Sequence, residues 1–338
     1  MPGEFEYIAW LRARTPADPR VLIGPGDDCA ALVPGSRPLL VTTDMLMDGT
    51  DFVLAEVGAR RAGRKAMAVN LSDIAAMAGV PTAAVVSVAL PRSNLTPQPP
   101  SLRRKGEPDK GRSLAPPSFL GKGVGGVGLA EDLYLGLRDV ADAFGVALVG
   151  GDTNSWNGPL VISVTALGEA TARGPVRRSG AKPGDWLFVT GPLGGSILGR
   201  HLDFTPRVRE ALALHAAVQL NAMIDISDGL TADLNHICEE SGCGAVLIAE
   251  AIPISDAARR LSATSGKSPL EHALGDGEDF ELVFAVSPED GAKLLRAAPV
   301  PGLRKIGECV EAGLWLEVGS VRTKLEPAGW VRQAPPRR

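Results

Sequence analysis

The sequence predicts an α+β protein with two mixed α/β domains. Apolar runs of strand length alternate with helix-like stretches through both halves of the 338-residue chain, and this alternation is typical of packed layers of helices and sheets. The length suits two domains of ordinary size, and a hydrophobic content of 45% can fill their cores. We expect an N-terminal domain, binding metal and nucleotide, at residues 1–168 and a C-terminal domain at residues 169–338.

Bulk composition argues against several classes of function. The formal net charge of −4 provides no basic field that would attract nucleic acid. No apolar run reaches the length of a membrane-spanning helix, and the acidic start lacks the pattern of a signal peptide. The four cysteines form no CxxC pair, which fits reduced thiols in the cytoplasm. We therefore expect a cytoplasmic protein that binds neither nucleic acid nor a membrane.

In the first half, predicted strands end beside acidic and hydroxyl residues. The strands expected at 21–23, 38–44 and 147–149 each lead into such a group. The polar residues and glycine concerned are Asp27, Asp28, Thr42, Thr43, Asp44, Gly151, Asp152 and Thr153. Because Gly and Asp are also common in surface turns, the alternative is a set of solvent-exposed turns. Two further strands, at 82–90 and 160–167, are expected in this half.

The stretch at 60–79 predicts a helix that carries one carboxylate, Asp73, among alanines and leucines. A buried acid is costly unless a cation or hydrogen-bond donors neutralise it, so Asp73 is a candidate ligand. The alternatives are a partly exposed helix acid or a helix start capped by Ser72. A second helix, amphipathic, is expected at 129–144.

Residues 93–128 interrupt the pattern of strands and helices. They are rich in Pro, Gly, Ser and basic residues, a composition typical of a flexible, solvated insertion. The last six, 123–128, satisfy GxGxxG, but they do not follow a strand, as a dinucleotide-binding turn requires. We therefore reject a dinucleotide site and expect a flexible loop between a strand and a helix.

The second half repeats the alternation. The expected strands are at 186–190, 245–252, 281–286 and 304–310, and the expected helices at 206–220, 231–240 and 288–297. Asp225 and Asp228 precede one of these helices, and Glu278 and Asp279 precede one of the strands. Acids beside turns thus recur in both halves.

These acids suggest a chemistry if they share one cleft. Carboxylates and hydroxyls are hard ligands suited to Mg²⁺, and neighbouring acids raise one another's pKa unless cations are present. No GxSxG, HExxH or Walker A motif occurs. A magnesium-rich acidic site without an obvious base suits phosphoryl transfer from ATP to an acceptor that is already a phosphate. The prediction depends on the acids converging, which their spacing alone does not establish.

A series of ordered stretches carries a family resemblance. They are GEFEYIA, GPGDDCA, VTTDMLMDG, KAMAVNLSDIAAMAG, GGDT, RRSGAKPGDWLFVTG, DISDGLTADLNHI and GEDFEL, and they span nearly the whole chain apart from residues 93–128. They resemble the thiamine-monophosphate kinases of the aminoimidazole ribonucleotide synthetase-like superfamily. The resemblance implies two α/β domains, a homodimer whose N-terminal strands form a barrel, and several Mg²⁺ ions. It also implies transfer of the ATP γ-phosphoryl group to thiamine monophosphate, which yields thiamine diphosphate.

The resemblance also implies roles for individual residues. The implied Mg²⁺ ligands are Asp28, Thr42, Thr43, Asp44, Asp73, Asp152, Asp225 and Asp228. Among them, Asp44, Asp73, Asp152 and Asp228 are the implied catalytic residues. The implied ATP contacts are Tyr134, Gly151, Asp152, Arg178 and Ser227. Glu278 and Trp330 are the implied contacts to thiamine monophosphate. Arg178 can clamp phosphate oxygens, and the alternative is that it lies in a solvated basic turn. Trp330 can stack on a cationic thiazolium, and the alternative is that it covers the edge of a core.

One position departs from the family pattern. Asp51 stands in DGTDF, where the family usually has a histidine that contacts the substrate. An aspartate there would repel a phosphate unless it is protonated or bound to metal, so Asp51 is included only as a weak candidate for the substrate site. Because of Asp51, a second hypothesis stays open: the chain is a different ATP-using enzyme of the same superfamily that acts on another phosphorylated substrate. A catalytically silent nucleotide-binding homologue is the remaining alternative.

Overall fold

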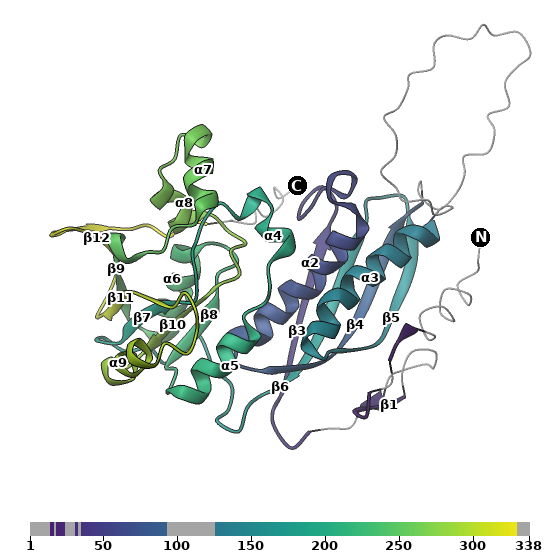
Figure 1. Cartoon of the computed structure of the whole chain (residues 1–338), viewed down its shortest axis with the longest axis horizontal. Helices are drawn as coiled ribbons and strands as arrows, with labels where there is room; N and C mark the ends of the chain where they lie inside the picture. Colours follow the sequence, from purple (N-terminus) through teal and green to yellow (C-terminus); the bar gives the residue numbers. More distant parts are fainter. Residues whose placement is uncertain (1–13, 17, 24–30, 33–34, 93–125, 330–338) are drawn as a thin grey trace, which may run out of the picture. The chain divides into compact units, whose positions relative to one another are not determined.

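The computed structural model describes residues 14–16, 18–23, 31–32, 35–92 and 126–329 (Figure 1). The chain divides into two compact units, here called the first unit and the second unit. The first unit draws on residues 1–34, 43–67 and 82–166, and the second unit on residues 35–42, 68–81 and 167–338. Two short segments of the N-terminal half, which contain Thr42 and Asp73, therefore belong to the second unit.

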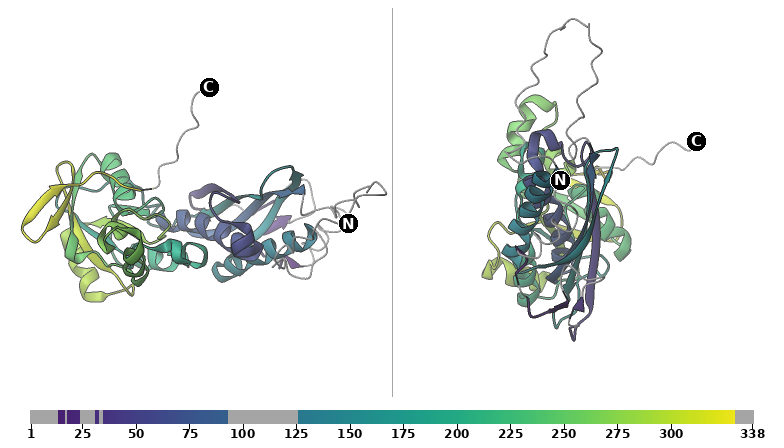
Figure 2. Two further views of the ribbon diagram at one scale, coloured as in Figure 1. Left: turned by 90° about the horizontal axis from the view of Figure 1, so that it is seen from above. Right: turned by 90° about the vertical axis from the view of Figure 1, so that its right-hand side faces the viewer.

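A four-stranded sheet with the strand order β3-β6-β4-β5 is built from the N-terminal half. Its strands are β3 (Leu39–Met47), β4 (Val80–Pro91), β5 (Ala147–Trp156) and β6 (Val161–Glu169). Helices α2 (Leu54–Ala76) and α3 (Gly126–Phe144) cover one face of this sheet (Figures 1 and 2). A short antiparallel pair, β1 (Val21–Ile23) and β2 (Ala31–Leu32), comes earlier in the chain.

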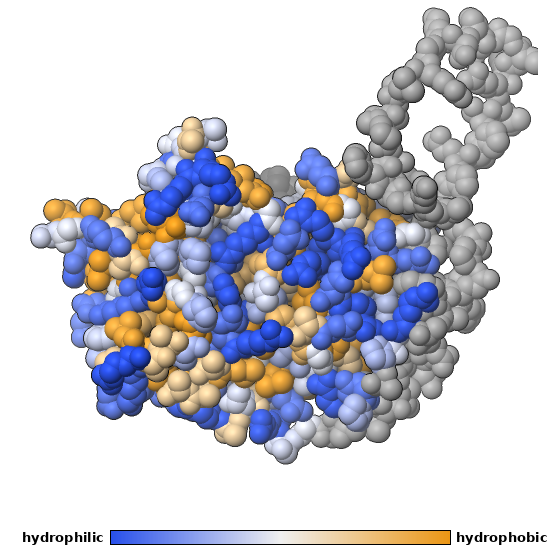
Figure 3. Space-filling view, viewed as in Figure 1, coloured by the Kyte–Doolittle hydropathy of each residue, from blue (hydrophilic) through white to orange (hydrophobic). Residues whose placement is uncertain are grey.

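Glycines let α2 and α3 approach each other closely. A Cβ on Gly63 would lie 2.2 Å from the carbonyl oxygen of Leu133, and one on Gly136 would lie 1.9 Å from that of Arg60. The Arg60 guanidinium also donates two hydrogen bonds of 2.8 Å to the Asp139 carboxylate. The side of α3 that faces the viewer in Figure 3 is largely hydrophilic, as the prediction of an amphipathic helix requires.

The second unit is organised around a seven-stranded sheet with the order β13-β12-β9-β11-β7-β10-β8. Neighbouring strands are antiparallel except for the parallel pair β12 and β9. The strands are β7 (Trp186–Val189), β8 (Ala222–Asp225), β9 (Gly244–Ile248), β10 (Leu282–Val286), β11 (Arg304–Val310), β12 (Leu314–Val318) and β13 (Val321–Lys324). Every residue of β8 and β10 is buried, so β10 is a continuous apolar run and β8 is an apolar run that ends in Asp225.

Helices connect the strands of this sheet. They are α4 (Arg200–Asp203), α5 (Val208–Ala217), α6 (Leu230–Ser241), α7 (Asp256–Ser265), α8 (Pro269–Gly275) and α9 (Pro288–Ala297). Two short 3-10 turns, η2 (Ser196–Leu198) and η3 (Ala249–Ala251), complete the unit. A core of leucine, isoleucine, valine and alanine side chains, with few aromatics, joins helix α6 to the sheet. None of the helices in the described part of the chain is both long and apolar enough to span a membrane.

The predicted α+β class is confirmed, whereas several predicted boundaries are wrong. Strand β3 continues to Met47, so Thr42 to Asp44 lie within a strand and not at its end. Strand β5 likewise continues through Asp152 to Trp156. Ser72 lies well inside α2, which excludes a helix start at this position. Asp28, Trp330 and almost all of the insertion, residues 93–125, lie outside the described residues.

Candidate functional site

The best-defined part of the candidate site belongs to the second unit and begins at Asp73. This carboxylate projects from α2 near its C-terminal end, and Thr42 Oγ1 of strand β3 donates a short hydrogen bond to its Oδ2 atom. Burial raises the pKa of Asp73, while the Thr42 hydroxyl and then the positive charge of Arg178 act in the opposite direction. Arg178 itself is exposed. The two implied ligands Thr42 and Asp73 are therefore in direct contact.

Asp225 is the second acid of this group and the last residue of β8. It is buried, and Ser72 Oγ, from the residue next to Asp73, donates a 2.6 Å hydrogen bond to its Oδ2 atom. Burial, followed by repulsion from the Asp73 carboxylate, raises the pKa of Asp225 to about 8. Two segments separated by about 150 residues of chain thus place two carboxylates in one electrostatic environment.

This pair fits a divalent cation. The half-buried Asp73 and the buried Asp225 repel each other and lose hydration, and both effects are relieved when a cation binds between them. The nearby donor atoms are carboxylate and hydroxyl oxygens, which Mg²⁺ prefers over nitrogen or sulfur ligands. The arrangement therefore favours a hard divalent cation at Asp73 and Asp225.

The turn after β8 supplies further polar groups at the start of α6. Its N-cap residue is Gly229, which has no side chain to cap the helix. Asp233, four residues on, does so instead, because its Oδ2 atom accepts hydrogen bonds of 3.0 Å from the amides of Asp228 and Gly229. Burial raises the pKa of Asp233 to about 7. Ligand atoms of Asp228, Asp233 and His236 lie within 4.8 Å of one another.

Sequence reasoning missed Asp233 and His236. The signal that could have found them is the spacing of three residues between Asp233 and His236, which places both on one face of a helix that begins just after Asp228. The motif DISDGLTADLNHI contains both residues, but only its first four were considered as site residues.

The loop that carries Glu278 is fastened to this same turn. The amides of Glu278 and Phe280 donate hydrogen bonds of 2.7 Å and 2.8 Å to the carbonyls of Ser227 and Ile226. Glu278 and Phe280 both have positive φ values, 61° and 49°, a conformation that non-glycine residues rarely adopt. Local strain of this kind is often kept at functional sites.

Between these two strained residues lies Asp279, which is fully buried. Its Oδ2 atom accepts a 2.7 Å hydrogen bond from the Gly194 amide, while its Oδ1 atom has no hydrogen-bond partner among the described residues. Burial raises the pKa of Asp279 to about 7. The carboxyl therefore takes up a proton as the pH falls through neutrality, and the protonated form is less costly to bury.

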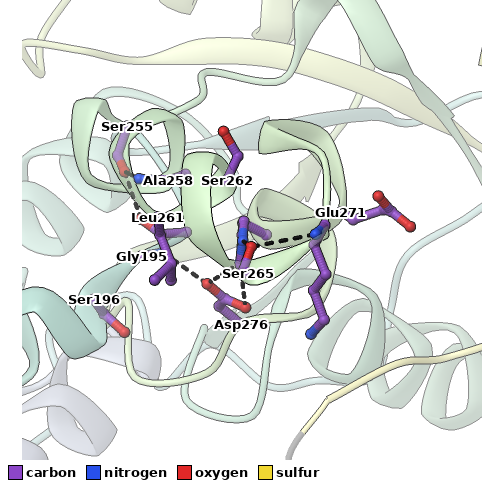
Figure 4. Close-up of polar contacts among 12 residues, drawn as sticks. Gly195, Ser196, Ser255, Ala258, Leu261, Ser262, Ser265, Glu271 and Asp276 are labelled. Atoms are coloured by element: carbon purple, nitrogen blue, oxygen red, sulfur yellow. Dashed lines mark hydrogen bonds and ion pairs between the residues drawn. The ribbon is translucent and has the colours of Figure 1, made fainter.

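Further polar contacts fix the glycine turn next to this loop (Figure 4). Asp276 Oδ2 accepts a 2.9 Å hydrogen bond from the Gly195 amide, and Ser196 Oγ donates one of 2.6 Å to the Gly277 carbonyl. His272 Nδ1 also contacts Asp276, at 2.9 Å, and its Nε2 atom lies 2.6 Å from Ser265 Oγ. His272 is buried, so it links α7 to α8 and to the glycine turn.

Other implied site residues belong to the first unit. Tyr134 is buried in α3 and its hydroxyl accepts a 3.2 Å hydrogen bond from Arg138 Nη1. Gly151 lies against the neighbouring strand, where a Cβ would lie 1.9 Å from the Val86 carbonyl oxygen, so no other residue fits there. Asp152, beside it in β5, is exposed. Thr43 Oγ1 donates a 3.1 Å hydrogen bond to Val164 of β6, and Asp44 is half-buried in β3.

Asp51 closes a turn after β3. Its Oδ2 atom accepts a 2.7 Å hydrogen bond from the Met47 amide, and its carbonyl accepts one of 2.7 Å from Lys65 Nζ. Lys65 is almost completely buried, with 1% of its surface exposed. The aspartate that departs from the family pattern therefore has a structural contact of its own.

Comparisons with known sequences identify the family of the chain. The family of AIR synthase related proteins matches the chain in two parts, with its N-terminal domain over residues 26–170 and its C-terminal domain over residues 182–314. A thiamine-monophosphate kinase of Rhodopirellula baltica is 40% identical and covers 97% of this chain and 96% of its own. One of Mycobacterium tuberculosis is 35% identical and covers 91% of this chain and 85% of its own.

Solved structures of thiamine-monophosphate kinases are also similar to this chain. A thiamine-monophosphate kinase from Stenotrophomonas maltophilia has a TM-score of 0.72 and 31% identity, and covers 94% of this chain and 97% of its own. The structure of AaThiL complexed with AMPPCP and TMP has a TM-score of 0.68 and 29% identity, with 97% and 96% covered. HypE of Escherichia coli, a hydrogenase maturation protein, shares the fold with a TM-score of 0.70 at 19% identity, with 97% and 99% covered.

Proposed function

Because the chain belongs to the AIR synthase related family and, within it, to the thiamine-monophosphate kinases, we propose that it phosphorylates thiamine monophosphate to thiamine diphosphate with ATP. The observation that carries the proposal is the pair formed by half-buried Asp73 and buried Asp225, held by Thr42 and Ser72. A nucleotide and a phosphate monoester both bring negative charge to one site, and an acidic pair that retains a cation allows them to meet.

Asp73 and Asp225 would hold Mg²⁺, together with Asp228 on the turn before α6. Bound Mg²⁺ would neutralise phosphate oxygens and orient the transferred group. Thr42 and Ser72 keep the two carboxylates in fixed orientations through their hydrogen bonds. Fixed ligands of this kind reduce the reorganisation needed during the reaction.

The chain's own residues would then align the two substrates. The positive charge of Arg178 partly opposes the rise that burial causes in the pKa of Asp73. The side chain is exposed, so it can bind phosphate oxygens of ATP. Ser227 is the proposed second contact to ATP. The acceptor is already an anionic phosphate, so no proton has to be removed before in-line attack, and alignment with charge neutralisation is sufficient.

Glu278 is the proposed contact to the thiamine moiety. It is half-buried on the strained loop, and its carboxylate suits a cationic ring by charge. Residues of the first unit, namely Asp44, Tyr134, Gly151 and Asp152, together with Thr43 and the weak candidate Asp51, remain proposed by resemblance. The assignment of residues 1–168 to metal and nucleotide binding stays a proposal of the same kind.

We also propose a homodimer that forms through β3. Leu39, Val41, Met45 and Met47 are exposed by 62%, 60%, 56% and 38%. These residues alternate along an edge strand of the four-stranded sheet and so share one face. A contiguous exposed apolar face marks an interaction surface, and pairing with a second copy would cover it. The three described cysteines are free thiols, which suits the cytoplasmic location that we propose.

The proposal is tested with the purified chain, ATP, Mg²⁺ and a panel of phosphorylated vitamins, with products separated by chromatography. We expect a second phosphate to be added to thiamine monophosphate in preference to every other member of the panel. Efficient phosphorylation of a different member, with thiamine monophosphate left unchanged, would overturn the assignment of the substrate. Tight binding of ATP without any turnover would identify a silent homologue.

A further inference from the structure

Glu281 is a buried carboxylate with an unusually complete set of donors. It has no exposed surface, and it follows the strained loop immediately before β10. Thr190 Oγ1 donates a 2.5 Å hydrogen bond to it. Arg207 donates from Nε and Nη2 at 2.8 Å and 2.5 Å, and Arg200 Nη2 donates a further short hydrogen bond. We call this group of four residues the Glu281 clamp.

Both arginines come from a segment that is far from Glu281 in sequence. Arg200 begins α4 and also donates a 2.7 Å hydrogen bond to the Pro192 carbonyl. Arg207 is the N-cap residue of α5 and also binds Glu210, at 2.9 Å. A carboxylate buried without partners would be very costly, whereas two guanidinium groups can satisfy it with charge-assisted hydrogen bonds. The clamp therefore ties residues 200–207 to the end of the loop.

The loop in turn depends on a firm anchor at Glu281. Its main chain passes through two left-handed residues, Glu278 and Phe280, and such conformations persist only where the surroundings enforce them. The Ile226 amide donates a 2.7 Å hydrogen bond to the Glu281 carbonyl, which continues the ladder that holds Glu278 and Phe280 to the turn after β8. Phe204, between the two arginines in sequence, stacks on Phe280 with ring centroids 4.0 Å apart.

We propose that Arg207, assisted by Arg200, is a positioning residue that holds Glu278 in its binding conformation through Glu281. The inference rests on the proposed function, because Glu278 is the proposed contact to thiamine monophosphate. Arg207 carries most of the effect, since it donates two of the clamp's hydrogen bonds while Arg200 donates one. Nothing in this role requires either arginine to touch a substrate.

Arg207→Lys tests the clamp, because a lysine keeps the charge but cannot reproduce the two-pronged contact. The first measurement is amide hydrogen exchange without ligands. We expect the amides of Glu278 and Phe280 to exchange roughly tenfold faster, the factor that corresponds to weakening one charge-assisted hydrogen bond. Arg322→Lys is the matched control, since Arg322 forms a partly exposed ion pair with Glu317 in the same unit. It should leave exchange in this loop unchanged.

The second measurement separates positioning from a general structural role. Arg207→Lys should raise KM for thiamine monophosphate by roughly tenfold with little change in KM for ATP. In a Glu278→Gln background the same substitution should raise KM for thiamine monophosphate by less than about threefold, because Arg207 and Glu278 act through one contact. Equal factors in both backgrounds would overturn the proposal.

Two outcomes of the exchange experiment would also overturn it. Unchanged exchange at Glu278 and Phe280 would show that the clamp does not hold the loop. Faster exchange spread equally over β9 and α9 would show general destabilisation instead. If the parent protein fails to phosphorylate thiamine monophosphate, the proposed function falls, while the exchange result still decides whether Arg207 fixes the loop.

Discussion

Replacing Asp225 by asparagine is expected to stabilise the metal-free protein and to abolish its kinase activity. The side chain keeps its shape, and its remaining oxygen can still accept the hydrogen bond from Ser72 Oγ. What disappears is a carboxyl group that is buried beside Asp73. Stability and activity should therefore change in opposite directions, which simple damage to the fold cannot produce.

The magnitude follows from the pKa of Asp225. Burial and the neighbouring Asp73 raise that pKa from 3.8 to about 8, so at pH 7 the metal-free folded protein keeps this carboxyl protonated while the unfolded chain does not. Holding the proton about three pKa units above its ordinary value costs about 4 kcal/mol, at about 1.4 kcal/mol for each unit. Asparagine avoids this cost, and we expect a net gain on the order of 2–4 kcal/mol in the free energy of unfolding.

Denaturant unfolding at pH 7, with and without Mg²⁺, is the assay. Without Mg²⁺, Asp225→Asn should be the more stable protein, and Glu311→Gln, which changes an exposed acid of the same unit, should match the parent. Added Mg²⁺ should stabilise the parent, because a ligand of the folded state alone shifts the equilibrium, and should stabilise the variant far less. A variant that is less stable than the parent without Mg²⁺, or a parent that does not respond to Mg²⁺, would refute the reasoning.

Three further predictions concern separate parts of the chain. The pKa of Asp279 is raised by burial to about 7, so the folded state binds the proton more tightly and stability falls as the pH rises from about 4 to about 7. Asp279→Asn should therefore raise the melting temperature at about pH 8 but not at about pH 4, and a lower melting temperature at pH 8 would count against the assignment. Asp51→His should leave kinase turnover intact or increase it, and a large loss would show that Asp51 has a role of its own in the reaction. Met45→Lys places a charge on the exposed apolar face of β3 and should yield a monomer by light scattering, where an unchanged dimer would locate the interface elsewhere.

Sequence patterns predicted the elements that have a single strong signal. Helix α9 and strand β11 begin and end at the residues expected for them, because each is a short periodic run bounded by turn residues. Helices α7 and α8 were not predicted. Both helices are short and bury few residues. They begin after the serine caps Ser255 and Ser268, which cannot be told apart by sequence from the many other serines nearby.

The site was predictable as a set of residues, but its geometry was not. The contact of Ser72 with Asp225 joins residues 153 positions apart, and no local pattern contains that information. Glu281 shows the same limit, because it reads as the first residue of a buried strand and its two arginine partners lie more than 70 positions away. Only the packing of α4 and α5 reveals that this carboxylate is neutralised.

The central claim, that an acidic pair holding Mg²⁺ lets ATP phosphorylate thiamine monophosphate, is tested most directly by following thiamine diphosphate formation at increasing Mg²⁺ for the parent and for Asp73→Asn. We predict a saturable dependence on Mg²⁺ for the parent, no product when a chelator is present, and no product from the folded variant at any concentration of Mg²⁺. Product formation by the parent that is unaffected by the chelator, or turnover by Asp73→Asn close to that of the parent, would contradict the account.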